Sequence, residues 1–286
     1  MVEAVVGRAI SVGPPYFNLT FGPIMAVALV VLPLGPLLAW KRGDALGALQ
    51  RLWTAAAAAL AAGLAALLLV RPGGALAAAG ATLGVWLIGG ALAEAAERIR
   101  LGRASLAETG RRAAGLPRGA WGTTLAHLGV GVFVLGACVE TAGKSEAARV
   151  LAPGGRLEVG GYVLTLQEVR AEEGPNYFAE RAIIAVVQGS RPVCTVRPQR
   201  RLYPAAGQTT SEVALCTAGL SDVYVVLGER REQGWLVRAY WNPLAKLIFL
   251  GPLLIAIGGL LSLSDRRLRI GAPGRARRPV QTAPAE

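Results

Sequence analysis

The sequence predicts an α-helical integral membrane protein of about five transmembrane helices with an inserted, external all-β domain. Of its 286 residues, 53% are hydrophobic and 17% are charged, a composition too apolar for an ordinary soluble protein. Five segments are predominantly apolar over about 20 residues, the length that crosses the hydrocarbon core of a bilayer. Roughly 100 residues before the last of these segments change to short runs of alternating polarity, as β-strands do.

The five predicted spans divide the chain into a membrane part and an external part. They cover residues 21–40, 52–70, 75–93, 119–139 and 243–263. The turn Arg71-Pro72-Gly73-Gly74 between the second and third spans predicts an antiparallel helical hairpin. We therefore expect an external N-terminal segment at 1–20, a membrane domain of four helices at 21–139, an external β domain at 140–242, a fifth span at 243–263 and a basic cytoplasmic tail at 264–286.

The formal charge of +12 is better explained by membrane topology than by a nucleic-acid partner, because the basic residues occupy defined loops. They follow the first, third and fifth spans, at Lys41, Arg42, Arg51, Arg98, Arg100, Arg103, Arg111, Arg112, Arg118, Arg266, Arg267, Arg269, Arg275, Arg277 and Arg278. The hairpin turn on the opposite side contains only Arg71. Alternation of the five spans then places the basic loops in the cytoplasm and residues 140–242 outside, as the positive-inside rule requires. We expect the tail to bind anionic membrane lipid, and no nucleic acid is predicted as a partner.

Residues 140–242 contain six or seven short runs that predict β-strands. The predicted strands are 157–159, 162–169, 178–188, 193–196, 210–215, 222–227 and 235–240. The Gly160-Gly161 pair between the first two predicts a tight hairpin. Short strands in this number indicate a small antiparallel barrel or sandwich, with an OB-like barrel as one form. Because both ends of the insert join membrane helices, the domain should cap the outer surface.

His127 is the only histidine in the chain, and it lies within the fourth predicted span. An ionisable side chain inside hydrocarbon is costly and is therefore a functional candidate, and imidazole is well suited to ligating haem iron. At about 100° per residue, the same helix face carries mostly small residues, at Ala120, Thr124, Gly131, Val134 and Cys138. The residues leave two interpretations open. Either the face leaves room for a flat macrocycle or a proton relay, or His127 hydrogen-bonds to a neighbouring helix and the small residues serve helix packing.

Any haem bound by this chain would need help from another polypeptide. A b-type haem normally takes two axial ligands, and Met1 and Met25 are poorly placed to supply the second one. The three cysteines form no Cys-x-x-Cys pair, which excludes a c-type haem attachment motif. Cys194 and Cys216 both lie in the external domain, where an oxidising compartment could join them in a disulfide, whereas Cys138 is expected to be a packing residue.

Aromatic residues flank two of the spans on the outer side. Residues 13–18 (GPPYFN) precede the first span, and Trp235, Tyr240 and Trp241 precede the last. Both groups are interpreted as anchors at the membrane interface, and the first is alternatively a loop facing a partner or cofactor. No Ser/His/Asp set and no nucleotide-binding loop can be assembled, so ordinary hydrolase and kinase chemistry has no support.

A set of longer motifs covers nearly the whole chain. They are residues 11–23 (SVGPPYFNLTFGP), 35–42 (GPLLAWKR), 121–122 (WG), 126–129 (AHLG), 174–177 (GPNY), 200–203 (RRLY), 222–229 (DVYVVLGE) and the segment from 250–251 (LG) to 264–267 (SDRR). In composition and order these motifs resemble those of the haem lyase subunit of cytochrome c maturation, the CcmF/NrfE family.

The resemblance implies a role in attaching haem to apocytochrome c in the periplasm, outside the bacterial inner membrane. Family members have a tryptophan-rich WWD segment, which binds the haem to be delivered through two external histidines, and a permanent transmembrane b haem held by two further histidines. His127 matches the histidine of the family's Gly/Ala-His-x-Gly motif, which implies that it is one axial ligand of the haem b iron. The haem b is expected to reduce the delivered haem iron, with quinol as an electron donor.

The chain departs from the family pattern in lacking the WWD segment and the other three histidines, which belong to the family's N-terminal half. We therefore expect a C-terminal piece, either a natural split subunit or a truncated reading frame, that is not active alone. The implied partners are the N-terminal half with its WWD segment, apocytochrome c and other maturation proteins. Two alternatives remain: a non-catalytic scaffold that docks apocytochrome or maturation partners through the β domain, and a membrane transporter or proton relay that uses His127.

Overall fold

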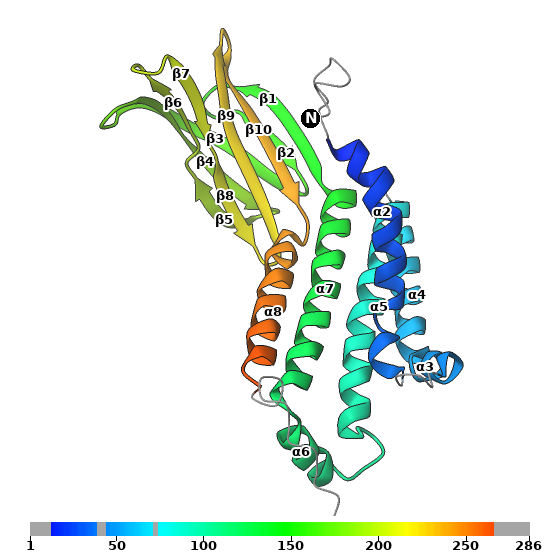
Figure 1. Cartoon of the computed structure of the whole chain (residues 1–286). Helices are drawn as coiled ribbons and strands as arrows, with labels where there is room; N and C mark the ends of the chain where they lie inside the picture. The colour runs from blue at the N-terminus through cyan, green and yellow to red at the C-terminus, as the bar shows by residue number, and fades with distance from the viewer. Residues whose placement is uncertain (1–12, 39–43, 71–73, 266–286) are drawn as a thin grey trace, which may run out of the picture.

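The computed structural model describes residues 13–38, 44–70 and 74–265, and it consists of a helical part joined to a β domain (Figure 1). Within the described residues, four helices are long and apolar enough to cross a membrane, and a further apolar helix has 17 residues. The β domain is inserted between the last two long helices. The predicted fold class, a helical membrane protein with an inserted β domain, is confirmed.

The helices follow the predicted spans with shifted ends. They are α2 (Pro14–Val31), the short 3-10 helix η1 (Gly35–Leu37), α3 (Ala45–Arg51), α4 (Trp53–Leu69), α5 (Gly74–Ile99), α6 (Leu106–Gly115), α7 (Arg118–Gly143) and α8 (Ala245–Leu263). Helix α2 begins at Pro14 rather than at residue 21, because prolines are well tolerated in the first turn of a helix. The predicted turn at 71–73 and the basic residues beyond 265 lie outside the described residues, as do Lys41 and Arg42.

Two helical features escaped the hydropathy analysis. Helix α5 continues past residue 93 to Ile99, because Glu94 forms an ion pair with Arg98 one turn later. Helix α6 is amphipathic and short, and the Ser105 side chain caps its N-terminus by accepting from the N–H of Glu108. Both features lie at the end of the helical part that is far from the β domain (Figure 1).

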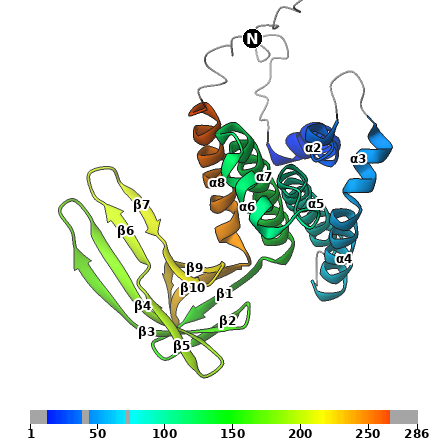
Figure 2. The ribbon, with the colours of Figure 1, turned by 90° about the horizontal axis from the view of Figure 1, so that it is seen from below.

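Helices α8, α7, α5 and α4 form an open row in which each packs against the next, and α2 lies against α5 (Figure 2). The helices approach closely through small residues. Gly122, Gly129 and Gly136 of α7 contact α8, and a Cβ on any of them would collide with backbone or side-chain atoms of α8. On the other side of α7, Gly131 lies against Gly84 and Ile88 of α5.

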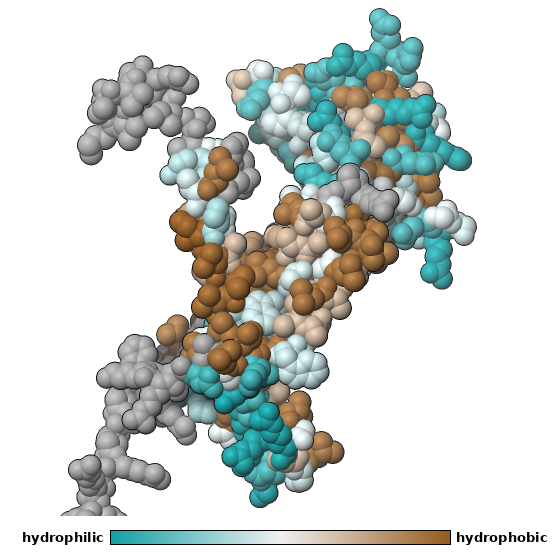
Figure 3. All heavy atoms as spheres, turned by 90° about the vertical axis from the view of Figure 1, so that its right-hand side faces the viewer, coloured by the Kyte–Doolittle hydropathy of each residue, from teal (hydrophilic) through white to brown (hydrophobic). Residues whose placement is uncertain are grey.

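The surface of the row is hydrophobic between two hydrophilic regions (Figure 3). One hydrophilic region is the β domain. At the other end, Glu97 pairs with Arg51 at 3.7 Å and with Arg103 at 3.3 Å. Asp265, at the end of α8, accepts a hydrogen bond of 3.0 Å from the Gly119 N–H in the first turn of α7, where a negative charge complements the helix dipole. This distribution of polarity fits a membrane-spanning row of helices.

The β domain is a sandwich of two antiparallel sheets. Its strands are β1 (Ser145–Leu151), β2 (Arg156–Val159), β3 (Tyr162–Glu173), β4 (Phe178–Gln188), β5 (Arg191–Val196), β6 (Gln199–Tyr203), β7 (Gln208–Glu212), β8 (Ala214–Ala218), β9 (Ser221–Arg231) and β10 (Gly234–Asn242). The first sheet has the order β1-β10-β9-β8, and the second has the order β2-β3-β4-β6-β7 with β5 also paired to β4. The alternating residues of the two inner faces form one core, which includes Leu164, Ile184, Val225 and Val237.

The strand predictions were partly wrong. Ten strands are present where six or seven were expected, and β1 and β6 were missed. The predicted strand 210–215 is in fact two strands, β7 and β8, which lie in different sheets on either side of Val213. The arrangement is a sandwich rather than an OB-like barrel. The hairpin at Gly160-Gly161 is present, with both residues at positive φ (56° and 81°), which glycine adopts readily.

Candidate functional site around His127

His127 lies in the first half of α7 and is only partly buried. It lines a narrow, partly enclosed space that is too small to admit a water molecule. The other walls are the chain from Leu32 to Pro36, at the end of α2 and the start of η1, and the face of α5 that carries Gly90 and Glu94. Three separate segments therefore meet at the only histidine of the chain.

Glu94 is the unexpected member of this site, since its side chain is 2% exposed. Arg98 donates two hydrogen bonds to Oε1, one of them from Nε at 3.0 Å. The second oxygen, Oε2, is buried and has no hydrogen-bond partner among the described residues. Sequence reasoning missed Glu94 because the apolar stretch ends at residue 93. The signal that could have found it is the i,i+4 spacing of Glu94 and Arg98, which indicates a continuing helix.

The small face of α7 does not leave room for a macrocycle. Thr124, Gly131 and Val134 are buried, and a Cβ on Gly131 would lie 2.8 Å from Ile88 of α5. Farther along the same face, Cys138 packs against Gly80 of α5. The interpretation that these residues make space for a porphyrin is wrong, because α5 fills that space and the small residues serve helix packing.

The residues present fit part of a haem site. Imidazole is a suitable axial donor, and the unpartnered Oε2 of Glu94 is the kind of acceptor that the second N–H of a ligating histidine requires. The narrow space beside His127 has no room for even a water molecule, whereas ordinary ligand pockets have volumes of about 300 Å³ or more. A porphyrin would therefore have to reach His127 from the outer surface of the row of helices, where the residue is partly exposed.

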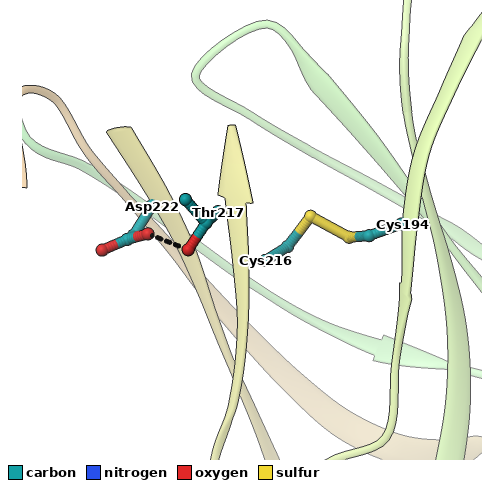
Figure 4. Close-up of a disulfide and its surroundings, with 4 residues drawn as sticks. All are labelled: Cys194, Cys216, Thr217 and Asp222. Atoms are coloured by element: carbon teal, nitrogen blue, oxygen red, sulfur yellow. Dashed lines mark hydrogen bonds between the residues drawn. A yellow bond between two sulfur atoms is a disulfide. The ribbon is translucent and has the colours of Figure 1, made fainter. Parts of the chain in front are cut away.

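The predicted cysteine pair lies well away from His127, in the β domain. Cys194 of β5 and Cys216 of β8 form a disulfide with a Cα–Cα distance of 6.2 Å (Figure 4). Because β5 and β8 belong to different sheets, the disulfide links the two layers of the sandwich. The disulfide is therefore a structural feature of the sandwich. Cys138 is a free cysteine, and within the described residues no group of three or more His, Cys, Asp or Glu side chains is arranged to hold a metal ion.

A second candidate is an open groove of about 700 Å³ where the outer face of the first sheet meets the end of α7. Tyr224 and Tyr240 contact edge to face there, with ring centroids 5.7 Å apart. Arg238 also lines the groove, and the Tyr240 hydroxyl, followed by the charge of Glu146, raises the pKa of its guanidinium. The groove therefore presents aromatic rings and a permanent positive charge beside the membrane-facing end of the domain.

The predicted aromatic anchor before the last span needs one correction. Trp235 lies at the far end of β10, at the turn to β9, so its assignment as a membrane anchor is wrong.

Comparison with known proteins shows that the chain is similar to part of several cytochrome c-type biogenesis proteins. Residues 142–243 match the family described as CcmF C-terminal beta-sandwich. The cytochrome c-type biogenesis protein CycK of Rhizobium meliloti is 44% identical over 98% of this chain and 42% of its own length. The biogenesis protein CcmF of Pseudomonas aeruginosa is 31% identical over 99% of this chain and 42% of its own length.

A solved structure titled Cytochrome c Heme Lyase CcmF shares the fold, with a TM-score of 0.68 at 24% identity. The match covers 88% of this chain and 41% of that chain. The chain thus spans less than half the length of the relatives that it matches.

Proposed function

Because the chain belongs to the CcmF family of cytochrome c-type biogenesis proteins and corresponds to a C-terminal portion of its members, we propose that it is the membrane redox part of a haem lyase. In this proposal His127 supplies one axial ligand of a transmembrane b haem. The second ligand and the WWD segment come from the N-terminal half, which lies outside this sequence. When bound, the haem supplies one-electron transfer from quinol to the iron of the haem that is attached to apocytochrome c.

The observation that carries this proposal is the environment of His127. It is a partly exposed imidazole within a row of apolar helices, and it lines the same narrow space as Glu94, whose buried Oε2 has no hydrogen-bond partner among the described residues. Ionisable side chains inside the membrane cost free energy and are usually present for function. The row of helices is also open, so a second polypeptide can pack against it and complete a site at the surface of α7 (Figure 2).

We further propose that the sandwich and the N-terminal end of α2 are periplasmic and that the opposite end faces the cytoplasm, in a bacterial inner membrane. The charge distribution supports this orientation. Arg51, Arg98, Arg103, Arg111 and Arg112 all lie at or near the end of the row that is far from the sandwich. Positive side chains near the ends of spans favour the cytoplasmic side.

The groove beside Tyr224 and Arg238 favours a second function, that of a scaffold. Its volume of about 700 Å³ and its position at the junction of the sandwich with α7 suit the docking of a peptide from apocytochrome c or from another maturation protein. Aromatic rings and arginine are enriched at the energetic centres of such interfaces. Under this alternative the chain binds partners but no haem.

Co-expression with a WWD-containing N-terminal half tests the redox proposal. The purified complex should show the absorption of a low-spin b haem, and His127→Ala should abolish it. Thr123→Ala, one turn earlier on α7, is the matched control, because the Thr123 hydroxyl is bonded only within its own helix, at 2.9 Å to the Gly119 carbonyl. It should leave the spectrum unchanged.

A rescue experiment separates ligation from folding. His127→Gly with added imidazole should restore the haem spectrum if the side chain acts as a ligand. A spectrum that survives His127→Ala would refute the assignment of His127. If no haem copurifies in any combination while apocytochrome still binds, the scaffold function is the correct one.

A further inference from the structure

The buried carboxylate of Glu94 has an oxygen that nothing in its own helix uses. Arg98 directs both of its hydrogen bonds to Oε1. Oε2 has less than 1 Å² of exposed surface and no hydrogen-bond partner in the described part of the chain. Buried acceptors are almost always satisfied in folded proteins. The arrangement therefore favours a donor on the side of Glu94 that lines the narrow space shared with His127.

Among the described residues that line this space, His127 is the only one with a side chain that can be that donor. The remaining residues around the space have no polar side-chain atoms; they are Leu32, Pro33, Pro36, Leu87, Gly90 and Ala91. The space is also too narrow for a water molecule, so a bridging water is not available. The imidazole ring carries an N–H, and His127 lines the same narrow space as Glu94.

Helix geometry directs the two side chains toward each other. In the antiparallel pair of α5 and α7, Gly80 lies opposite Cys138 and Ile88 lies opposite Gly131. Extending this register places Glu94 slightly closer than His127 to the end of the row of helices that is far from the β domain. Helical side chains lean toward the N-terminus of their own helix. Since the two helices run in opposite directions, His127 leans toward the level of Glu94, and Glu94 leans toward the level of His127.

We propose that Glu94 is a positioning residue for His127, with Oε2 accepting a hydrogen bond from one imidazole nitrogen. The bond selects one neutral tautomer and leaves the other nitrogen free as a lone-pair donor. The consequence for haem rests on the proposed function: a carboxylate partner makes the imidazole a stronger donor, as in metal sites whose ligating histidine is bonded to a carboxylate. A stronger donor stabilises the ferric state and lowers the midpoint potential.

Because the chain has a single histidine, ¹⁵N-histidine labelling of the full chain in nanodiscs gives the signals of one imidazole without assignment. No haem is needed for this measurement. We expect one neutral tautomer, with the N–H nitrogen shifted downfield by its hydrogen bond. Glu94→Met, which keeps the volume but removes the acceptor, should abolish the downfield shift and mix the tautomers. Arg98 can then turn to solvent, since its side chain is already 38% exposed.

Glu97→Met is the matched control, because Glu97 lies on the same helix and pairs with Arg51 and Arg103 rather than facing the narrow space. It should leave the histidine spectrum unchanged. Glu94→Gln retains a weaker acceptor and should give an intermediate shift, which keeps the test decisive if Glu94→Met does not fold. A wild-type histidine spectrum in Glu94→Gln, or in folded Glu94→Met, would overturn the proposal.

The haem-loaded complex separates this inference from the proposed function. The midpoint potential should be more positive in Glu94→Met than in Glu97→Met. If haem binds through His127 but both variants keep the wild-type potential and ¹⁵N shifts, the inference about Glu94 fails and the proposed function stands. If no haem binds but Glu94→Met changes the ¹⁵N spectrum, the pairing stands and the proposed function fails.

Discussion

The ammonium group of Lys246, in the first turn of α8, lies 3.1 Å from Oδ1 of Asp222 at the start of β9. Asp222 is 5% exposed and also accepts a hydrogen bond of 2.8 Å from the Thr217 hydroxyl (Figure 4). Beside it, the backbone N–H of Lys246 donates to the Leu220 carbonyl at 3.2 Å. The turn between β8 and β9 is therefore bound directly to the beginning of the last membrane helix, where a carboxylate also complements the helix dipole.

Asp222→Asn should weaken this junction. The asparagine side chain cannot neutralise Lys246, so we expect the free energy of unfolding to fall by about 1–2 kcal/mol. The loss should be small for a hydrogen bond to a buried charge, because the Lys246 side chain is 38% exposed and water screens the ion pair. Thermal unfolding in detergent, followed by tryptophan fluorescence, measures the change. Glu229→Gln is the control, since its pair with Arg231 is exposed on both sides, and it should change stability by less than about 0.5 kcal/mol. Equal effects of the two substitutions would contradict the role assigned to Asp222.

Loss of the disulfide should destabilise the sandwich. The bond closes a loop with a sequence separation of 22, for which chain entropy predicts about 3 kcal/mol. Cys194→Ser combined with Cys216→Ser should lower the denaturation midpoint of the β domain by a corresponding amount, and treatment of the wild type with a reductant should do the same. The control is Cys138→Ala, which leaves the disulfide intact. A reductant effect that persists in the double variant would show that the disulfide is not its cause.

Adjacent glycines of α8 should respond differently to substitution. A Cβ on Gly258 would lie 2.6 Å from the Gly122 carbonyl oxygen of α7, whereas a Cβ on Gly259 would meet no atom within 4 Å. Gly258→Leu should therefore force α7 and α8 apart at a cost of about 1–3 kcal/mol, and Gly259→Leu should be tolerated. Resistance of the detergent-solubilised chain to thermal aggregation measures both variants. Similar behaviour of the two would exclude close packing of α7 on α8 at this level.

The proposed orientation predicts which surfaces are reachable from outside the cell membrane. Ser190, in the turn between β4 and β5, and Ala107, on α6, are both exposed. In a Cys138→Ala background, a cysteine at position 190 should react with a membrane-impermeant maleimide added to spheroplasts, and a cysteine at position 107 should react only after lysis. The reverse pattern would invert the topology.

The helices and the importance of the histidine could be predicted from the sequence because hydropathy is a local property. Each long span was predicted to within a few residues at most ends, and His127 stood out because an ionisable group in hydrocarbon is rare. The burial of Glu94 could not be predicted in the same way. This burial depends on the segment 32–36 and α7 covering one side of α5, beyond the point where the apolar stretch of α5 ends.

In the β domain, the alternation of polar and apolar residues predicted some strands but not others. Alternation located β4 and the hairpin at Gly160-Gly161, since both depend on residues close in the chain. It did not separate β7 from β8. Each pairs with its neighbour in the chain, β7 with β6 and β8 with β9, but the change of sheet at Val213 depends on how the two sheets pack together.

The residue pattern alone was enough to predict the membrane class and the position of the inserted domain and to single out the one histidine, and it indicated the family through motifs spread along the chain. The surroundings of that histidine and the pairing of the cysteines became known only from the folded arrangement of the chain. The small face of α7 packs against α5, Glu94 shares a narrow space with His127, and Cys194 meets Cys216 across two sheets. These relationships join residues that are far apart in the chain, so they depend on helix register and sheet pairing, which hydropathy and spacing do not encode.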